Sequence, residues 1–323
     1  MRAPKFWSQP PGALAAALAP LAWVYEAAGK LRRAVTTPVE VSAKVICIGN
    51  LVAGGAGKTP TAIAVLKRLR ARGVAAHALT RGYGGREAGP LRVDLSRHEA
   101  SDVGDEALLL ARIAPTWVGR DRVAAARVAV AEGARVLVMD DGFQNPALRK
   151  DVSLIVIDGG YGVGNGRVMP AGPLRESVAS GLARAQGVVL IGDGEAAGFG
   201  ATSLPILRAR IVPTPGALAL ADRAVLAFAG IGRPEKFFST LESLGCRLVG
   251  SVAFADHHPY RPDEIMRLVE AAAESRAALV TTEKDAVRLP PEARAMVEVL
   301  PVELVFEDEA ALDRALAPAL AHA

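Results

Sequence analysis

The residues best suited to chemistry lie in a glycine-rich loop between an apolar, β-branched segment and a helical one. This stretch, KVICIGNLVAGGAGKTPTAIAVLKRLR, spans residues 44–70. Glycines let the backbone wrap around phosphate oxygens, and the free N–H groups at a helix start bind negative charge. The Lys58 ammonium can then reach nucleotide phosphates, and the Thr59 hydroxyl can bind Mg²⁺. We therefore expect ATP and Mg²⁺ as cofactors, with the phosphates held by Gly54, Gly55, Ala56, Gly57, Lys58, Thr59 and Pro60.

The loop departs from the usual phosphate-loop template at one position. The template has a glycine six residues before the lysine, where this sequence has Val52. Other glycines stand at positions 49, 54, 55 and 57. Because the strand before and the helix after lie where the template needs them, the pattern indicates a variant phosphate loop rather than an incidental turn.

Two acids end a second apolar segment, VLVMDDG, at Asp140 and Asp141. A carboxylate at such a strand end commonly binds Mg²⁺, directly or through water. Taken alone, it is often a turn or a helix cap. With a phosphate loop upstream, Asp140 becomes a candidate magnesium ligand beside Thr59.

The segments that must position these groups alternate between apolar strands and helices from Lys44 onward. This alternation predicts an α/β fold in which a P-loop-type parallel sheet is flanked by helices, with ligands at the carboxyl ends of its strands. A looser stretch predicts a hinge between about Pro205 and Leu220, followed by a smaller α/β domain. We expect an N-terminal amphipathic helix in residues 1–33, a kinase domain in 34–210, a smaller domain in 221–308 and a C-terminal helix in 309–323.

Composition narrows the possible functions. The 323 residues carry a net charge of +4, which suits anionic ligands or an anionic membrane surface. No basic run with interleaved aromatics is present, so we expect no nucleic-acid partner. The two cysteines, Cys47 and Cys246, predict buried thiols rather than a disulfide framework or a metal site.

The N-terminal segment has its own character. Arg2 and Lys5 precede an alanine- and leucine-rich stretch, and Lys30, Arg32 and Arg33 follow it. The spacing of its leucines, with Tyr25, predicts one apolar helical face, and its aromatic residues suit a lipid headgroup layer. Four interpretations compete: a signal peptide, a spanning helix, a helix packed on the protein's own core, and an interfacial helix lying on a membrane. We favour the last, because the stretch is too short and too interrupted to span a bilayer.

Several further motifs occur in a fixed order along the chain: TRGYGG, VGDEALLLAR, DDGFQ, MPAGPLRE, FADHHPY and TTEKDAVRL. Together with GNLVAGGAGKTP and the basic N-terminus, this ordered set closely resembles the tetraacyldisaccharide 4′-kinase family, from about Phe6 to about Leu289. The resemblance implies transfer of the ATP γ-phosphate to the 4′-hydroxyl of a tetraacylated disaccharide 1-phosphate, which gives lipid IV-A. It also implies peripheral association with the cytoplasmic face of the inner membrane, where this acylated lipid substrate resides. We expect a monomer.

The resemblance also implies catalytic roles. Asp105 is the candidate proton acceptor for the sugar hydroxyl, and Glu106 beside it is a candidate magnesium ligand. His257 is expected to pair with Asp105 from across the domain cleft. On residue type alone, Asp105 and Glu106 could equally be acids that stabilise a helix start, and His257 a solvated loop residue. Lys58 completes the expected catalytic set.

A further group of polar residues suits substrate or phosphate binding. Most of them lie in the same motifs, and two arginines lie in GRDR at residues 119–122. Arginine binds phosphate through its planar, two-pronged guanidinium. Lys284 is a candidate sensor of nucleotide or of the hinge. The candidates for substrate or phosphate contact are Asp141, Gln144, Arg175, Arg81, Tyr83, Arg120 and Arg122.

Other functions would share the phosphate loop. A P-loop ATPase or GTPase acting as a switch or metal-delivery chaperone would use Lys58, Thr59 and Asp140, but would not need FADHHPY or a membrane-seeking N-terminus. A soluble enzyme acting on a small metabolite would use the N-terminal helix only structurally. A membrane adaptor with a decayed loop is disfavoured because Gly57, Lys58 and Thr59 are intact.

Overall fold

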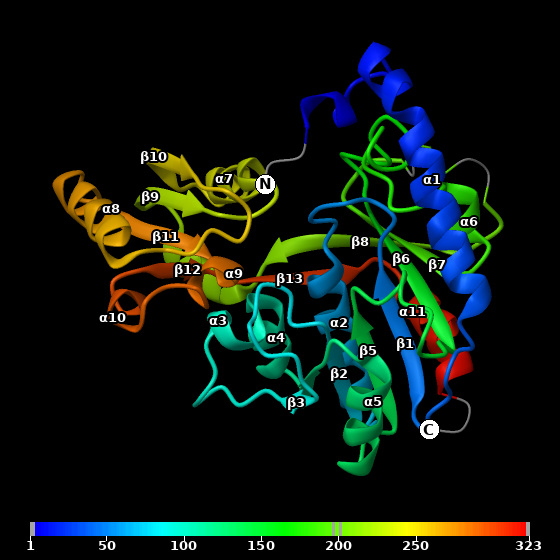
Figure 1. Cartoon of the computed structure of the whole chain (residues 1–323). Coiled ribbons are helices and arrows are strands. Elements are labelled where there is room, and N and C mark those ends of the chain that lie inside the picture. The colour runs from blue at the N-terminus through cyan, green and yellow to red at the C-terminus, as the bar shows by residue number, and fades with distance from the viewer. Residues whose placement is uncertain (1–3, 196–197, 200–201, 321–323) are drawn as a thin grey trace.

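A computed structural model describes residues 4–195, 198–199 and 202–320. Arg2, expected among the basic residues before the N-terminal helix, lies outside these ranges. The chain forms a nine-stranded sheet and a four-stranded sheet, each covered by helices on both faces (Figure 1).

The large sheet has the strand order β13-β8-β7-β6-β1-β5-β2-β4-β3. Its strands are parallel except β3 and β13, which pair antiparallel with β4 and β8 at the two edges. The central strands are buried on both faces, as expected for parallel strands under helices. The strands are β1 (Lys44–Gly49), β2 (Ala76–Thr80), β3 (Leu91–Arg92), β4 (Thr116–Val118), β5 (Val136–Asp140), β6 (Val152–Asp158), β7 (Gly187–Ile191), β8 (Ile206–Pro213) and β13 (Val302–Phe306).

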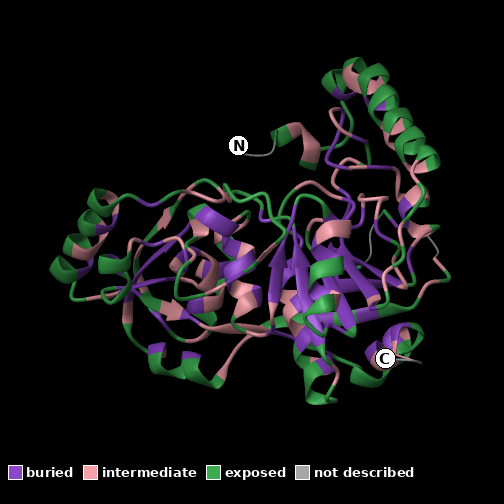
Figure 2. Ribbon diagram, turned by 60° about the horizontal axis from the view of Figure 1, so that its bottom comes forward, coloured by how far each residue is buried: buried purple, intermediate pink, exposed green. Residues whose placement is uncertain are grey.

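Successive side chains along a strand point to opposite faces of the large sheet and pack into two separate hydrophobic cores. In β1, Val45 and Cys47 belong to the core beneath α1 and α5, whereas Ile46 and Ile48 belong to the core beneath α2 and α11. Figure 2 shows the strands buried and the helices exposed along their outer faces. The helices of this domain are α1 (Ala13–Val35), α2 (Lys58–Ala71), α3 (Ala100–Val103), α4 (Asp105–Ala111), α5 (Arg122–Ala131), α6 (Val178–Leu182) and α11 (Glu309–Leu316), with short 3₁₀ turns η1 (Lys5–Ser8) and η3 (Ala317–Ala319).

The small sheet is parallel throughout, in the order β10-β9-β11-β12. Phe237 and Leu241 of α7 pack on one face, and Ile265 and Ala272 of α8 pack on the other. The elements are η2 (Pro215–Leu220), β9 (Ala224–Ala229), α7 (Pro234–Ser243), β10 (Arg247–Ala253), α8 (Pro262–Glu274), β11 (Ala278–Thr282), α9 (Glu283–Ala286), α10 (Pro291–Arg294) and β12 (Glu298–Leu300).

The connection between the sheets differs from the predicted boundaries. Residues 206–213, expected partly as a hinge, form β8, and residues 302–306, expected in the small domain, form β13 beside it (Figure 1). Leu207 and Ala209 of β8 and Leu304 of β13 enter the core of the large sheet. The chain therefore passes to the small domain through β8 and returns through β13. The alternation of apolar and polar residues in ILRARIVP is typical of a strand. The glycine-rich stretch just before it favoured the interpretation as a hinge.

The N-terminal helix α1 packs by one narrow face. Ala15 and Ala22 are buried against the large domain, and Arg33 reaches Glu176 at 3.6 Å. Its large apolar side chains point to solvent, with Trp23 75% exposed. The exposed set on α1 is Leu14, Leu21, Trp23, Val24, Tyr25, Leu31 and Val35. Of the predicted apolar face only Leu18 packs on the core, as a partly buried contact. Among the described residues, no helix combines the length and the apolar character needed to cross a bilayer.

Candidate active site

The carboxyl ends of the central strands bring the predicted residues to one edge of the large sheet. The phosphate loop follows β1, Asp140 ends β5, Arg81 follows β2, and Arg120 follows β4. This is the edge where ligands of parallel α/β sheets bind.

The phosphate loop turns sharply because two of its glycines adopt left-handed backbone angles. Gly54 has φ +117° and Gly57 has φ +87°, a region that other L-residues rarely enter. A Cβ on Gly57 would also lie 2.4 Å from Ile191 Cδ1. The turn delivers the chain into α2 at Lys58, so the backbone N–H groups of Lys58 and Thr59 stand free at the helix start. Pro60 has no N–H and instead fixes φ in the first turn.

Lys58 and Thr59 face the two acids of β5 and the turn after it. Thr59 Oγ1 donates to Asp140 Oδ2 at 2.7 Å, and Lys58 Nζ lies 3.8 Å from Asp141 Oδ1. Lys58 is largely buried. The loop and the acidic strand end, 81 residues apart in sequence, are thus one cluster.

Asp140 is fully buried in this cluster. Burial and the nearby Glu106 carboxylate raise the pKa of Asp140 to about 7, against the lowering effects of Lys58 and Thr59. Its Oδ1 has no hydrogen-bond partner among the described residues. A buried carboxylate oxygen without a donor, close to a second acid and a threonine hydroxyl, is a local environment that favours a cation.

A hydrogen-bond network joins Arg175 to Asp141 and Gln144. Arg175 Nη1 donates to Asp141 Oδ1 at 2.8 Å and to Gln144 Oε1 at 3.3 Å. Gln144 Nε2 donates to the carbonyl of Asn50 at 3.0 Å. These residues therefore connect the turn after β5 to the start of the phosphate loop.

Asp105 and His257 meet across the two domains. His257 Nδ1 lies 2.9 Å from Asp105 Oδ2, and the Asp105 side chain is only 2% exposed. The backbone N–H of Glu106 donates to Asp105 Oδ1 at 2.8 Å. Burial raises the pKa of Asp105, but the His257 hydrogen bond and the charges of Lys284 and Arg288 lower it by more and leave this pKa below its usual value. Asp105 is therefore held as a carboxylate.

Lys284 assigns the imidazole tautomer. Burial lowers the pKa of Lys284, but the carboxylates of Glu106, Asp105 and Asp256 raise it by a larger amount. The net shift of this pKa is upward, so the ammonium stays charged. An ammonium only donates, and Lys284 Nζ lies 3.3 Å from His257 Nε2. Nε2 then accepts, which leaves the His257 proton on Nδ1, directed at Asp105. Lys284 also lies 3.4 Å from Glu106 Oε1.

The loops after β2 and β4 contribute the remaining candidates. Tyr83 is 62% exposed, and its ring meets the His257 ring edge-on at 5.3 Å. Arg81 and Arg120 are exposed. Arg122 is buried and donates to the Gly119 carbonyl, while its Nε has no partner among the described residues. Burial and the neighbouring Arg81 charge lower the pKa of Arg122 to about 10.

The structure adds interdomain contacts that residue-by-residue reading missed. Asp158, at the end of β6, accepts from Arg233 at 2.9 Å and from Lys236 at 2.7 Å, both in the small domain. Arg288 lies 3.4 Å from Asp105. Arg288 belongs to the motif TTEKDAVRL, in which the sequence predicts a role only for Lys284, because a contact between domains leaves no local pattern. A Cβ on Gly232 would lie 3.5 Å from the Gly55 backbone nitrogen, so the small domain reaches the phosphate loop itself.

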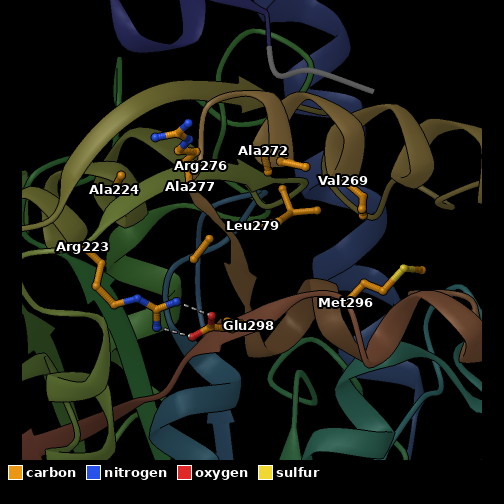
Figure 3. A pocket seen from close by; sticks show the side chains of 11 residues that line it. Arg223, Ala224, Val269, Ala272, Arg276, Ala277, Leu279, Met296 and Glu298 are labelled. Carbon is orange, nitrogen blue, oxygen red and sulfur yellow. Dashed lines mark hydrogen bonds and ion pairs between the residues drawn. The ribbon is translucent and has the colours of Figure 1, made fainter.

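A separate pocket of about 540 Å³ lies in the small domain, at the amino-terminal ends of the strands of the small sheet (Figure 3). Ala224, Ala278 and Glu298, which begin β9, β11 and β12, border it. Its lining residues are Arg223, Ala224, Val269, Ala272, Ala273, Arg276, Ala277, Ala278, Leu279, Met296 and Glu298. None of the candidate site residues belongs to it.

Comparisons with known proteins identify the family of this chain. A family profile described as LpxK, tetraacyldisaccharide-1-P 4′-kinase, matches residues 14–321. The chain belongs to this kinase family. Proteins named tetraacyldisaccharide 4′-kinase from Rhodospirillum centenum and Rhodospirillum rubrum are 56% and 51% identical to it, over 99% and 97% of this chain and 97% and 98% of theirs. LpxK from Aquifex aeolicus, crystallised in complex with ATP, matches with a TM-score of 0.76 and 25% identity over 95% of this chain and 99% of that one.

The family assignment confirms the P-loop α/β fold and the kinase prediction. It decides against a switch ATPase or a metal-delivery chaperone, which would share only the phosphate loop.

Replacing Lys58 by Met should lower kcat by about 100-fold or more, because the transferring phosphate loses its nearest ammonium. The matched control is Lys67→Met on the same helix, where the lysine is half exposed and pairs with Glu303 at 3.5 Å. Steady-state kinetics with thermal unfolding of each variant make the comparison. A folded Lys58→Met variant with wild-type turnover would remove Lys58 from the mechanism.

Proposed function

We propose that this kinase transfers the γ-phosphate of ATP to the 4′-hydroxyl of a tetraacyl disaccharide 1-phosphate. One observation carries the proposal beyond a generic P-loop protein. A buried carboxylate, Asp105, lies in the domain that holds the phosphate loop and is hydrogen-bonded to His257 of the other domain. A nucleotide hydrolase needs no such cross-domain base.

Asp105 is suited to accept the hydroxyl proton. A sugar hydroxyl is a weak nucleophile, and a positioned base helps as its oxygen attacks phosphorus. The new bond joins the sugar oxygen to the γ-phosphorus, the bond from that phosphorus to the β–γ bridging oxygen breaks, and ADP leaves. His257 Nδ1–H holds the Asp105 carboxylate in one orientation. Lys58 and the free N–H groups of α2 stabilise charge on the transferring group.

The residues present fit a bound Mg²⁺. Thr59 Oγ1, Asp140 Oδ1 and the nearby Glu106 are the oxygen ligands that this ion prefers. No cluster of three acidic, histidine or cysteine ligands occurs in the described ranges. That is consistent with an ion held partly by nucleotide phosphates and water. When bound, Mg²⁺ neutralises charge that develops on the phosphates.

Arg122 and Arg81 are our candidates for the phosphate of the lipid. The buried Nε of Arg122 has no hydrogen-bond partner in the described part of the chain, and the Arg81 charge lies near it. Two close guanidinium groups repel each other, and an anion between them would relieve that repulsion. Arg175 already forms an ion pair with Asp141 at 2.8 Å. Its proposed role is therefore to fix the turn after β5, where Asp141 lies.

The exposed apolar side of α1 supports docking on a lipid surface. Leu21, Val24, Leu31 and Val35 project from one side of the helix, and Arg32 lies close by. A helix with apolar and basic side chains can lie in the headgroup layer of an anionic membrane. We propose that α1 brings the enzyme to its acylated substrate on the cytoplasmic face of the inner membrane.

Incubation with labelled ATP, Mg²⁺ and tetraacyl disaccharide 1-phosphate in detergent should give a lipid with one additional phosphate. The matched control substrate carries a 4′-phosphate already and should take up no label, because its acceptor hydroxyl is blocked. Thin-layer chromatography and mass spectrometry identify the product. Normal ATP binding without any labelled lipid would defeat the proposal.

Changing Leu21, Val24 and Leu31 together to Ser should weaken binding to phosphatidylethanolamine–phosphatidylglycerol vesicles by about tenfold or more. Each side chain would lose roughly 1 kcal/mol or more of apolar burial. Val128→Ser on α5, which is 38% exposed in the wild type, serves as the control and should leave vesicle binding unchanged. Vesicle co-sedimentation and ATP titration measure the two properties. Unaltered sedimentation of the triple variant would argue against docking through α1.

A further inference from the structure

Arg288 is the most heavily engaged cation near the catalytic pair. Its side chain is only 6% exposed. Nη1 donates to the His258 carbonyl at 3.2 Å, and Nη2 donates to the Gly230 carbonyl at 2.9 Å. Nε donates to the Lys284 carbonyl at 3.2 Å. The guanidinium therefore uses all three of its nitrogens within the small domain.

These contacts converge on the backbone that presents His257. The Gly230 carbonyl that accepts from Arg288 also accepts from the His257 N–H at 3.1 Å. His258 is the next residue along the chain. His257 itself has φ +58°, a left-handed conformation that few non-glycine residues adopt, although histidine enters it more often than most. Arg288 thus contacts the carbonyl that accepts from the His257 N–H and the carbonyl of the residue that follows His257.

Asp285 fixes the guanidinium in turn. It is fully buried and accepts from Arg288 Nη2 at 2.5 Å, from the Tyr260 hydroxyl at 2.6 Å and from the Gly230 N–H at 2.9 Å. Thr282 Oγ1 lies 2.6 Å from its second oxygen. A buried carboxylate with this many donors holds the arginine in one place. The network runs from Asp285 through Arg288 to the His257 backbone.

The same guanidinium reaches across the domain boundary. Arg288 Nε lies 3.4 Å from Asp105 Oδ2, the oxygen that His257 also contacts. Because the Nε hydrogen is directed to the Lys284 carbonyl, this contact is a charge interaction. Arg288 therefore attracts Asp105 to the place where the His257 Nδ1–H is presented.

We propose that Arg288 is a positioning residue of the phosphoryl transfer, which holds His257 in its left-handed conformation and draws Asp105 into contact with it. The inference rests on the proposed Asp105–His257 pair. Lysine cannot replace this function, because one ammonium cannot match a planar guanidinium that donates to three carbonyls and a carboxylate.

A double-mutant cycle with purified full-length enzyme tests the inference. Arg288→Met and the charge-retaining Arg288→Lys are each made alone and with His257→Ala. In the wild-type background each should lower kcat by about tenfold or more, because a small misplacement of the base is costly. The KM for ATP should change by less than about twofold, since the phosphate loop belongs to the other domain. With His257→Ala most of the loss should disappear, because residues acting through one group are not additive.

Arg267→Met on α8 is the control. Arg267 is 74% exposed, and within the described ranges its one ion pair is with Asp263, at 3.4 Å, so kcat should be unchanged in both backgrounds. Should Arg288→Met fail to fold in thermal unfolding, Arg288→Lys carries the same cycle. Wild-type kcat in a folded Arg288 variant, or equal losses with and without His257, would overturn the positioning role alone. A fully active His257→Ala enzyme would instead overturn the proposed catalytic pair.

Discussion

Unpaired backbone N–H groups at the start of α2 attract anions, and the rest of the active site is arranged around that attraction. Gly57 has to adopt a left-handed conformation to bring the chain into the helix, and Ile191 leaves no space for a side chain there. Lys58 and Asp140 flank the helix start from α2 and β5. We propose that this geometry determines where a nucleotide phosphate binds. It does not determine which molecule receives the phosphate.

The acceptor chemistry depends on the second domain. Asp105 is buried at the start of α4, but its orienting histidine and two nearby cations, Lys284 and Arg288, come from the small domain. Because β8 and β13 carry both chain crossings between the domains, a movement there would alter the His257–Asp105 contact. The small domain also approaches the phosphate loop, where Gly232 lies beside Gly55, so its placement bears on both parts of the site. The Asp158 ion pairs with Arg233 and Lys236 provide a second contact between the same two bodies.

Local patterns predicted the parts of this protein that depend on local physics. The loop at residues 49–60 follows from strand, glycine and helix signals, and the acidic end of β5 follows from apolar periodicity. The contact between Asp105 and His257, 152 residues apart, came only from family resemblance, because no periodicity relates two domains. β8 and β13 were misplaced because a strand's partner is chosen by the sheet and not by its own sequence. Arg288 was missed for a similar reason, since its importance comes from carbonyls distant in the chain.

The central claim concerns where the terminal phosphates bind, and a crystal structure with Mg²⁺ and a non-hydrolysable ATP analogue tests it most directly. The account predicts the β- and γ-phosphates against the backbone of residues 54–59, with Lys58 Nζ turned from Asp141 to the γ-phosphate. It also predicts the Asp105 carboxylate on the side of the γ-phosphate away from the β-phosphate, where an acceptor oxygen would approach. An empty loop with the nucleotide bound elsewhere, or a γ-phosphate that points away from Asp105, would contradict the account.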